Sequence, residues 1–182
     1  MLIHILTFLP TKSAFTTSIL SKRWTSLCHS LTTLNFDDEG AENQDAISRF
    51  TRMVDRFLPS PPIVQLHHQP LQTFCLTSRA KPFNKFEVDN WAEAAKRRGV
   101  KNLHLSIYCA LLSPRFFTSQ TLIVLKLSGC FHIAKYGHKF ESVDLPSLKT
   151  LHLLEDTCIG VRDNFMKVLS GCPNLVDLYA PS

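Results

Sequence analysis

The stretch Leu148-Lys149-Thr150-Leu151-His152-Leu153 decides the fold, because its leucines follow the spacing LxxLxL. Successive side chains of an extended strand point to opposite faces, so Leu151 and Leu153 share one face. Apolar residues recur at this spacing along most of the chain. The six stretches start at Leu31, Leu71, Val100, Leu122, Leu148 and Leu175. This recurrence predicts one short strand for each stretch.

The intervals between these starts indicate a repeat protein. They are 40, 29, 22, 26 and 27 residues, and the last four lie within the roughly 20–29 residues typical of leucine-rich repeats. A strand this short cannot bury its leucines alone, so neighbouring units must stack in a parallel sheet. We therefore predict an α/β fold in which residues 31–182 form a leucine-rich-repeat solenoid of about six units, incomplete at its C-terminal end.

Several segments between the strands have the apolar spacing of helices. These helical return segments are residues 47–58, 91–95 and 161–169. For the second of them, Asp89 or Asn90 is a suitable N-terminal cap and Gly99 a suitable C-terminal stop. The chain is thus expected to alternate strand, return segment and strand.

The residues between the leucines should face away from the core, onto the concave side of the solenoid. Most of them are small or polar, and histidines recur at matching positions of two units. The partner-binding candidates on this face are Asn102, His104, Lys126, Thr150, His152, Asp177 and Tyr179. Two interpretations stay open: these residues form a partner-binding surface, or they are polar only because a strand face in contact with water must be soluble.

The first 30 residues differ from the rest and form a predicted compact helical segment. Leu2, Ile5, Leu6 and Leu9 have helical spacing, and Pro10 ends that helix. Residues 1–36 contain no acidic side chain, which places a boundary near Phe36. Composition alone also allows a small helical cap that seals the end of a larger domain.

Composition indicates a folded protein inside the cell. Of the 182 residues 45% are hydrophobic and 19% charged, enough for a sizeable core. No run of about 18 apolar residues could span a membrane. The six cysteines contain no CxxC pair, which favours free thiols in a reducing compartment, the cytoplasm or the nucleus.

The net charge of +5 raises the possibility of nucleic-acid binding, through the cluster of Lys96, Arg97 and Arg98 with Lys101. This cluster lies at the end of a predicted helix, where cations are stabilised by the helix dipole. A solvated helix terminus is therefore the preferred interpretation, and we expect neither nucleic acid nor membrane as a partner.

No motif for catalysis or cofactor binding is present. The sequence lacks GxSxG, GxGxxG, HExxH and a phosphate-binding loop. His67 and His68, like His132 and His138, have no cysteine or acidic residue at zinc-binding spacing. We expect no enzyme, no metal site and no cofactor.

Two motifs near the N-terminus and two in the repeats resemble a known family. Residues 9–12 read LPTK and residues 20–24 read LSKRW, while residues 145–153 read LPSLKTLHL and residues 170–175 read SGCPNL. Together they resemble the plant F-box/leucine-rich-repeat (FBD-type) family. The F-box motif is N-terminally truncated, because Met1 follows the usual Leu-Pro-acidic opening of the motif.

This resemblance implies a function. An F-box docks a Skp-family adaptor onto a cullin-RING ubiquitin ligase, and the repeats bind the protein to be ubiquitinated, so the chain would be the substrate-recognition subunit. The positions that match adaptor-facing residues of the family are Ile5, Leu6, Leu9, Pro10, Leu20, Lys22, Arg23 and Trp24. The alternative is a protein-binding repeat scaffold, or a degenerate copy, that does not recruit a ligase.

Overall fold

The computed structural model describes residue 13 and residues 31–39, 43–58, 70–79, 85–133, 143–154 and 162–180. The eight adaptor-facing positions predicted within residues 1–30 lie outside the described residues. In chain order the elements are β1 (Thr33–Asp37), α4 (Gln44–Phe57), β2 (Thr73–Ser78), α5 (Lys85–Arg97), β3 (Asn102–Leu112), the 3-10 helix η2 (Pro114–Phe117), β4 (Val124–Ile133), β5 (Thr150–Leu154), α6 (Arg162–Ser170) and β6 (Asp177–Tyr179).

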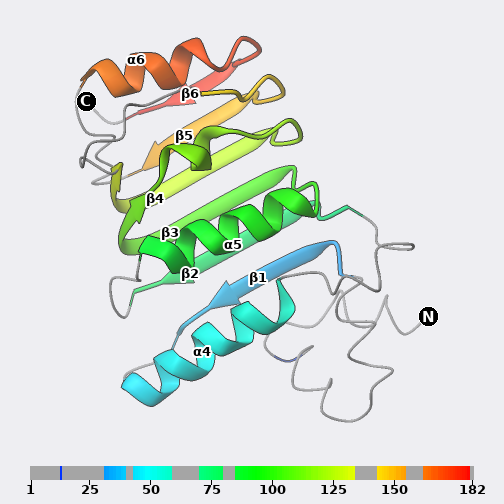
Figure 1. Ribbon diagram of the computed structural model, residues 1–182, viewed down its shortest axis with the longest axis vertical. Coiled ribbons are helices and arrows are strands. Elements are labelled where there is room, and N and C mark those ends of the chain that lie inside the picture. Colours follow the sequence, from blue (N-terminus) through cyan, green and yellow to red (C-terminus); the bar gives the residue numbers. More distant parts are fainter. Residues whose placement is uncertain are drawn as a thin grey trace.

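The six strands form one sheet in which every neighbouring pair is parallel. Their order across the sheet is their order along the chain, so the strands follow one another along the longest axis of the molecule (Figure 1). Each strand arises from one of the six LxxLxL stretches. The predicted α/β fold with parallel strands is confirmed.

The strands begin with the same hydrogen-bond arrangement at each step across the sheet. Thr32 O accepts from the N–H groups of Gln72 and Thr73, at 2.7 and 3.1 Å. Gln72 O in turn accepts from Lys101 and Asn102, at 3.3 and 2.9 Å. The carbonyls of Lys101, Ile123 and Lys149 each bind two N–H groups of the next stretch in the same way. This repetition aligns every strand with the one before it.

The leucine positions of the strands face a single core. Leu34, Phe74, Leu103, Leu125 and Leu151 occupy equivalent positions on successive strands, and all are 0% exposed. Helices α4, α5 and α6 and the turn η2 lie on one side of the sheet (Figure 1), and Val54, Trp91 and Val168 join the strand residues in one buried cluster. The opposite face of the sheet is left to the alternate residues.

Helix α4 packs as the sequence predicts, but it begins at Gln44, three residues before the predicted segment. The side chain of Asn43 caps its first turn by accepting from Ala46 N at 2.9 Å. Its apolar side buries Phe50, Val54 and Phe57 against the sheet. Asp55 on the same helix accepts from Trp91 Nε1 at 2.7 Å, which links α4 to α5.

Helix α5 ends where predicted but begins earlier. At its C-terminus Gly99 has φ +70°, with Gly99 N–H bonded to Lys96 O and Val100 N–H to Ala95 O. These two bonds and the left-handed glycine form a Schellman motif. The N-terminal prediction was wrong: Val88 is buried one turn before Trp91, so the apolar side and the helix extend back to Lys85.

Asp89 has a different contact from the cap that we predicted. Its Oδ1 atom accepts from Ser113 N at 3.1 Å and so joins α5 to the start of η2. Burial raises the pKa of this carboxyl group, while the bond from Ser113 N–H acts in the opposite direction.

A β-bulge interrupts the pairing of β3 with β4. Ser106 pairs with Ser128 and Cys109 with Cys130. Between these two pairs β3 advances by three residues and β4 by two, so β3 contains one extra residue. Gly129 lies at this point with φ +111°. A Cβ atom on Gly129 would lie 2.0 Å from Ile107 O, so the two backbones meet at a distance that only glycine permits.

Candidate functional site

The open face of the sheet, opposite the helices, brings the predicted partner-binding residues together. The strand register aligns its side chains in rows that cross the sheet. The first row is Thr33, Thr73, Asn102, Val124, Thr150 and Asp177, and the second row is Asn35, Cys75, His104, Lys126, His152 and Tyr179. All seven predicted residues lie in these two rows, and each is half-buried or exposed.

Contacts between neighbouring strands hold several side chains of the open face in place. In the first row Asn102 Nδ2 donates to Thr73 Oγ1 at 3.2 Å. At the β6 end His152 Nε2 lies 2.7 Å from Asp177 Oδ2, and the ring of His152 meets Tyr179 edge to face with centroids 6.0 Å apart. These contacts hold side chains of neighbouring strands in defined positions on the open face.

The middle of the second row is a cluster of three basic side chains. His104, Lys126 and His152 occupy one aligned position on β3, β4 and β5. Burial lowers the pKa of His104, and the charges of Lys126 and His152 lower it further. His104 is therefore mostly neutral at pH 7. Its Nδ1 atom lies 3.5 Å from Cys75 Sγ. Burial also raises the pKa of the Cys75 thiol, so it stays protonated.

Sequence reasoning missed a series of polar side chains at the border of this face. Thr121 Oγ1 donates to Val100 O at 3.0 Å, Ser147 Oγ to Gln120 O at 2.7 Å, and Asn174 Nδ2 to Pro146 O at 2.7 Å. Each of these residues directly precedes the first leucine of a stretch, and each donates to a carbonyl of the preceding unit. A polar residue at this repeated position was the available signal.

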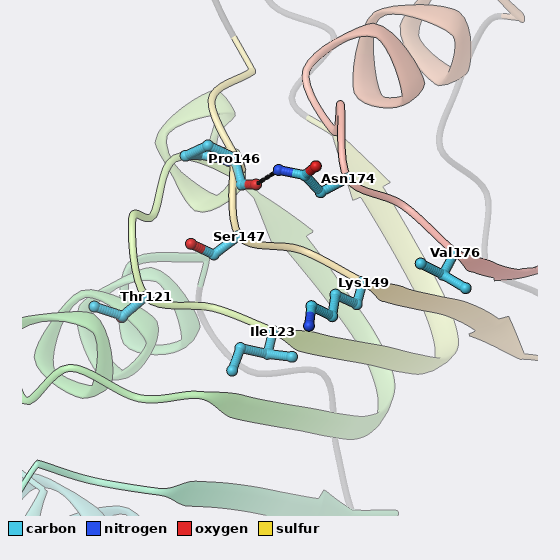
Figure 2. Close-up of a pocket in the computed structure, with 7 residues that line it drawn as sticks. All are labelled: Thr121, Ile123, Pro146, Ser147, Lys149, Asn174 and Val176. Atoms are coloured by element: carbon cyan, nitrogen blue, oxygen red, sulfur yellow. Dashed lines mark hydrogen bonds between the residues drawn. The ribbon is translucent and has the colours of Figure 1, made fainter.

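An open hollow of about 460 Å³ lies beside these residues, where the chain approaches β4, β5 and β6. Figure 2 shows its lining, with the bond between Asn174 and Pro146 on one side. The lining residues are Thr121, Ile123, Pro146, Ser147, Lys149, Asn174 and Val176. Val176 is 84% exposed, so this border of the sheet offers both apolar surface and one cation.

The basic cluster around α5 is not the solvated helix terminus that we predicted. Lys96 forms an ion pair with Glu93, and its Nζ atom donates to Arg115 O at 2.7 Å and Thr118 O at 3.1 Å. Arg98 is only 9% exposed. Arg97 and Lys101 alone are exposed. Half of the cluster is thus engaged within the protein, which weakens the argument for a nucleic-acid site there.

Arg98 directly follows α5 and connects this helix to the first unit. Its Nη2 atom donates to Leu31 O at 2.9 Å and its Nη1 atom to Leu58 O at 3.4 Å. Burial lowers the pKa of this guanidinium, so its charge is held in place by these carbonyls at a desolvation cost.

Replacing Arg98 with methionine should lower the free energy of unfolding by about 2–4 kcal/mol, because two buried carbonyls lose charged donors. Chemical denaturation followed by circular dichroism measures this change. The control is Arg97→Met on the exposed neighbour, for which we expect a change within about 0.5 kcal/mol. Equal effects of the two substitutions would contradict the structural role of Arg98.

Within the described ranges, no group of three or more histidine, cysteine or acidic side chains could hold a metal ion. The same part of the chain contains no helix that is both long enough and apolar enough to cross a membrane.

Comparisons with known proteins find similarity to F-box proteins of a plant. Residues 1–35 match the F-box domain. An F-box/LRR-repeat protein of Arabidopsis thaliana is 36% identical over 184 residues, which cover 96% of this chain and 34% of the relative. An F-box/FBD/LRR-repeat protein of the same plant is 32% identical over 98% of this chain and 38% of its own length. An FBD-associated F-box protein is 33% identical over 97% of this chain and 42% of its own length.

These comparisons confirm the resemblance predicted from the LPTK, LSKRW and repeat motifs. The chain spans 34% to 42% of the length of these curated relatives. No solved structure matches it significantly.

Proposed function

We propose, from the F-box match at residues 1–35 and the free face of the parallel sheet, that this chain is the substrate-recognition subunit of an SCF-type cullin-RING ubiquitin ligase. Its F-box would dock a Skp-family adaptor, and its repeats would bind the target protein. The F-box match is the observation that carries this proposal, and the similarity to the relatives extends from it through the sheet.

The proposed contribution to ubiquitin transfer is proximity rather than chemistry. A target held on the chain presents its lysines near the charged conjugating enzyme, so that transfer becomes effectively intramolecular. This role requires one surface for the adaptor and another for the target. We place the division at residue 30, with an F-box segment at residues 1–30 and a target-binding region at residues 31–182.

The target-binding region is proposed to be a leucine-rich-repeat solenoid. Three observations support this proposal: the sheet order that equals the chain order, the carbonyl arrangement repeated at each strand start, and the polar side chains Thr121, Ser147 and Asn174 that each bind the preceding unit. Each unit contacts its neighbours through the same bonds, as expected for a protein built from stacked repeats.

The adaptor surface is proposed to comprise Ile5, Leu6, Leu9, Pro10, Leu20, Lys22, Arg23 and Trp24. Leu20→Asp should abolish recovery of a purified Skp-family adaptor by the affinity-tagged chain, because a carboxylate replaces an apolar anchor worth roughly 1.5–3 kcal/mol and adds its own desolvation cost. Far-UV circular dichroism and thermal melting of the variant should match those of the parent chain.

The matched control for this experiment is His152→Ala on the open face, which should leave adaptor recovery unchanged. Undiminished recovery with Leu20→Asp would show that the adaptor docks elsewhere. A chain that captures target proteins but no adaptor would instead favour a repeat scaffold without ligase recruitment.

A further inference from the structure

We propose that the second row of the open face receives an acidic segment of the target protein, with its carboxylates seated over Lys126 between His104 and His152. This inference rests on the proposed function, because it takes the open face as the target-binding surface, and it adds the chemistry of the bound segment.

The geometry brings three basic groups to one place. His104, Lys126 and His152 occupy the same aligned position on three consecutive strands, and neighbouring strands are about 4.8 Å apart. The three side chains therefore span roughly 10 Å on one face, a width that an extended acidic segment crosses with two or three residues. All three are half-buried, so a bound carboxylate would meet them with reduced solvent screening.

The charges around this cluster leave Lys126 available. Among the described residues, no carboxylate lies within ion-pair distance of Lys126, whereas His152 already contacts Asp177. The other titratable groups in the second row are Cys75, whose thiol is protonated, and Tyr179 at the β6 end. Asp37 is on β1, three strands from Lys126, and its Oδ1 atom accepts from Glu39 N. The centre of the face is thus positive, and its acids lie toward the edges.

Proton uptake should accompany binding. Burial, Lys126 and His152 hold the pKa of His104 below its ordinary value, and a carboxylate seated beside the ring acts in the opposite direction by favouring the imidazolium. A ligand that raises the pKa of His104 must bind more tightly as the pH falls through that pKa. Affinity for an acidic segment is therefore expected to increase from pH 7.5 to pH 5.5.

The test uses the full chain and two peptides, acetyl-Gly-Glu-Glu-Glu-Gly-amide and its Gln counterpart, with inorganic phosphate as a third probe. NMR spectra of the histidine rings follow each titration at pH 7.5 and 5.5. We expect the Glu peptide to shift the His104 and His152 signals, to raise the His104 pKa, and to bind about fivefold or more tightly at pH 5.5. The Gln peptide should leave these signals unchanged.

Matched variants separate a local effect from general attraction. Lys126→Gln should weaken binding of the Glu peptide about fivefold or more, while Lys167→Gln, the same charge change at an exposed position of α6, should have no effect. Equal loss in both variants, unshifted histidine signals, or binding of phosphate without binding of the Glu peptide would overturn the inference.

The outcome is distinguishable from failure of the ligase proposal. Loss of peptide binding with adaptor recovery intact overturns only the acidic-segment inference. Loss of adaptor recovery with peptide binding intact overturns only the ligase role. Circular dichroism at pH 5.5 verifies that the chain is folded in both titrations.

Discussion

Leu125→Asp is expected to abolish cooperative folding of the sheet. Leu125 is 0% exposed at the centre of β4, and its aligned neighbours Leu103 and Leu151 are also fully buried. The substitution removes apolar burial and places a carboxylate in a cluster that offers it no donor. A loss above about 4–5 kcal/mol is comparable to the whole stability of many domains. Thermal melting followed by far-UV circular dichroism should show no cooperative transition, or one at least 10 °C lower, by roughly 2–4 °C per kcal/mol.

The control for Leu125→Asp lies three residues along the same strand. Ser128 is half-buried on the open face, so Ser128→Asp introduces the same carboxylate where water can reach it. This variant should melt within a few degrees of the parent chain, which corresponds to a change of about 1 kcal/mol in the free energy of unfolding. If both variants melt alike, the assignment of inward and outward positions on β4 is incorrect.

Gly129→Ala is the second substitution with a large expected effect. Its φ of +111° is a conformation that side chains rarely adopt, and the added methyl group would lie 2.0 Å from Ile107 O, a backbone atom of the adjacent strand. Backbone strain and overpacking each cost roughly 1–3 kcal/mol. We therefore expect a loss of about 3–5 kcal/mol in the free energy of unfolding, measured by urea denaturation.

Gly99→Ala is the matched control for Gly129→Ala. Gly99 also has a positive φ, +70°, but a Cβ atom there would meet only Pro70 Cβ, at an ordinary contact distance of 3.5 Å. Only the conformational cost remains, about 1 kcal/mol. A Gly129→Ala variant as stable as Gly99→Ala would mean that β3 and β4 do not approach closely at the bulge.

The open face shows which features of the site can be predicted from strand periodicity. Alternation along each LxxLxL stretch was sufficient to assign Asn102, His104, Lys126, Thr150 and His152 to one face, because the side-chain period of a strand is two. The recurrence of the same LxxLxL pattern also implied that these residues would be aligned across strands. Their pairwise contacts could not be predicted, since the bond from His152 to Asp177 depends on the register between β5 and β6.

Helix α5 shows where periodicity was insufficient. The spacing of the apolar residues predicts an N-terminal cap at Asp89 or Asn90, whereas Val88 continues the apolar side of the helix one turn earlier. Asp89 then finds its donor in Ser113, 24 residues away. Local sequence predicts that such a group needs a hydrogen-bond partner, but not which segment will supply it.

By itself the sequence determined which strand side chains are buried and which lie on the open face, because the LxxLxL spacing and the period of a strand are local properties of the chain. Only the tertiary structure decided where the polar groups find their partners. Arg98 binds a carbonyl 67 residues away, and Gly129 is required by the backbone of a neighbouring strand. These contacts depend on how the units stack, and stacking brings together atoms whose distance no local pattern encodes.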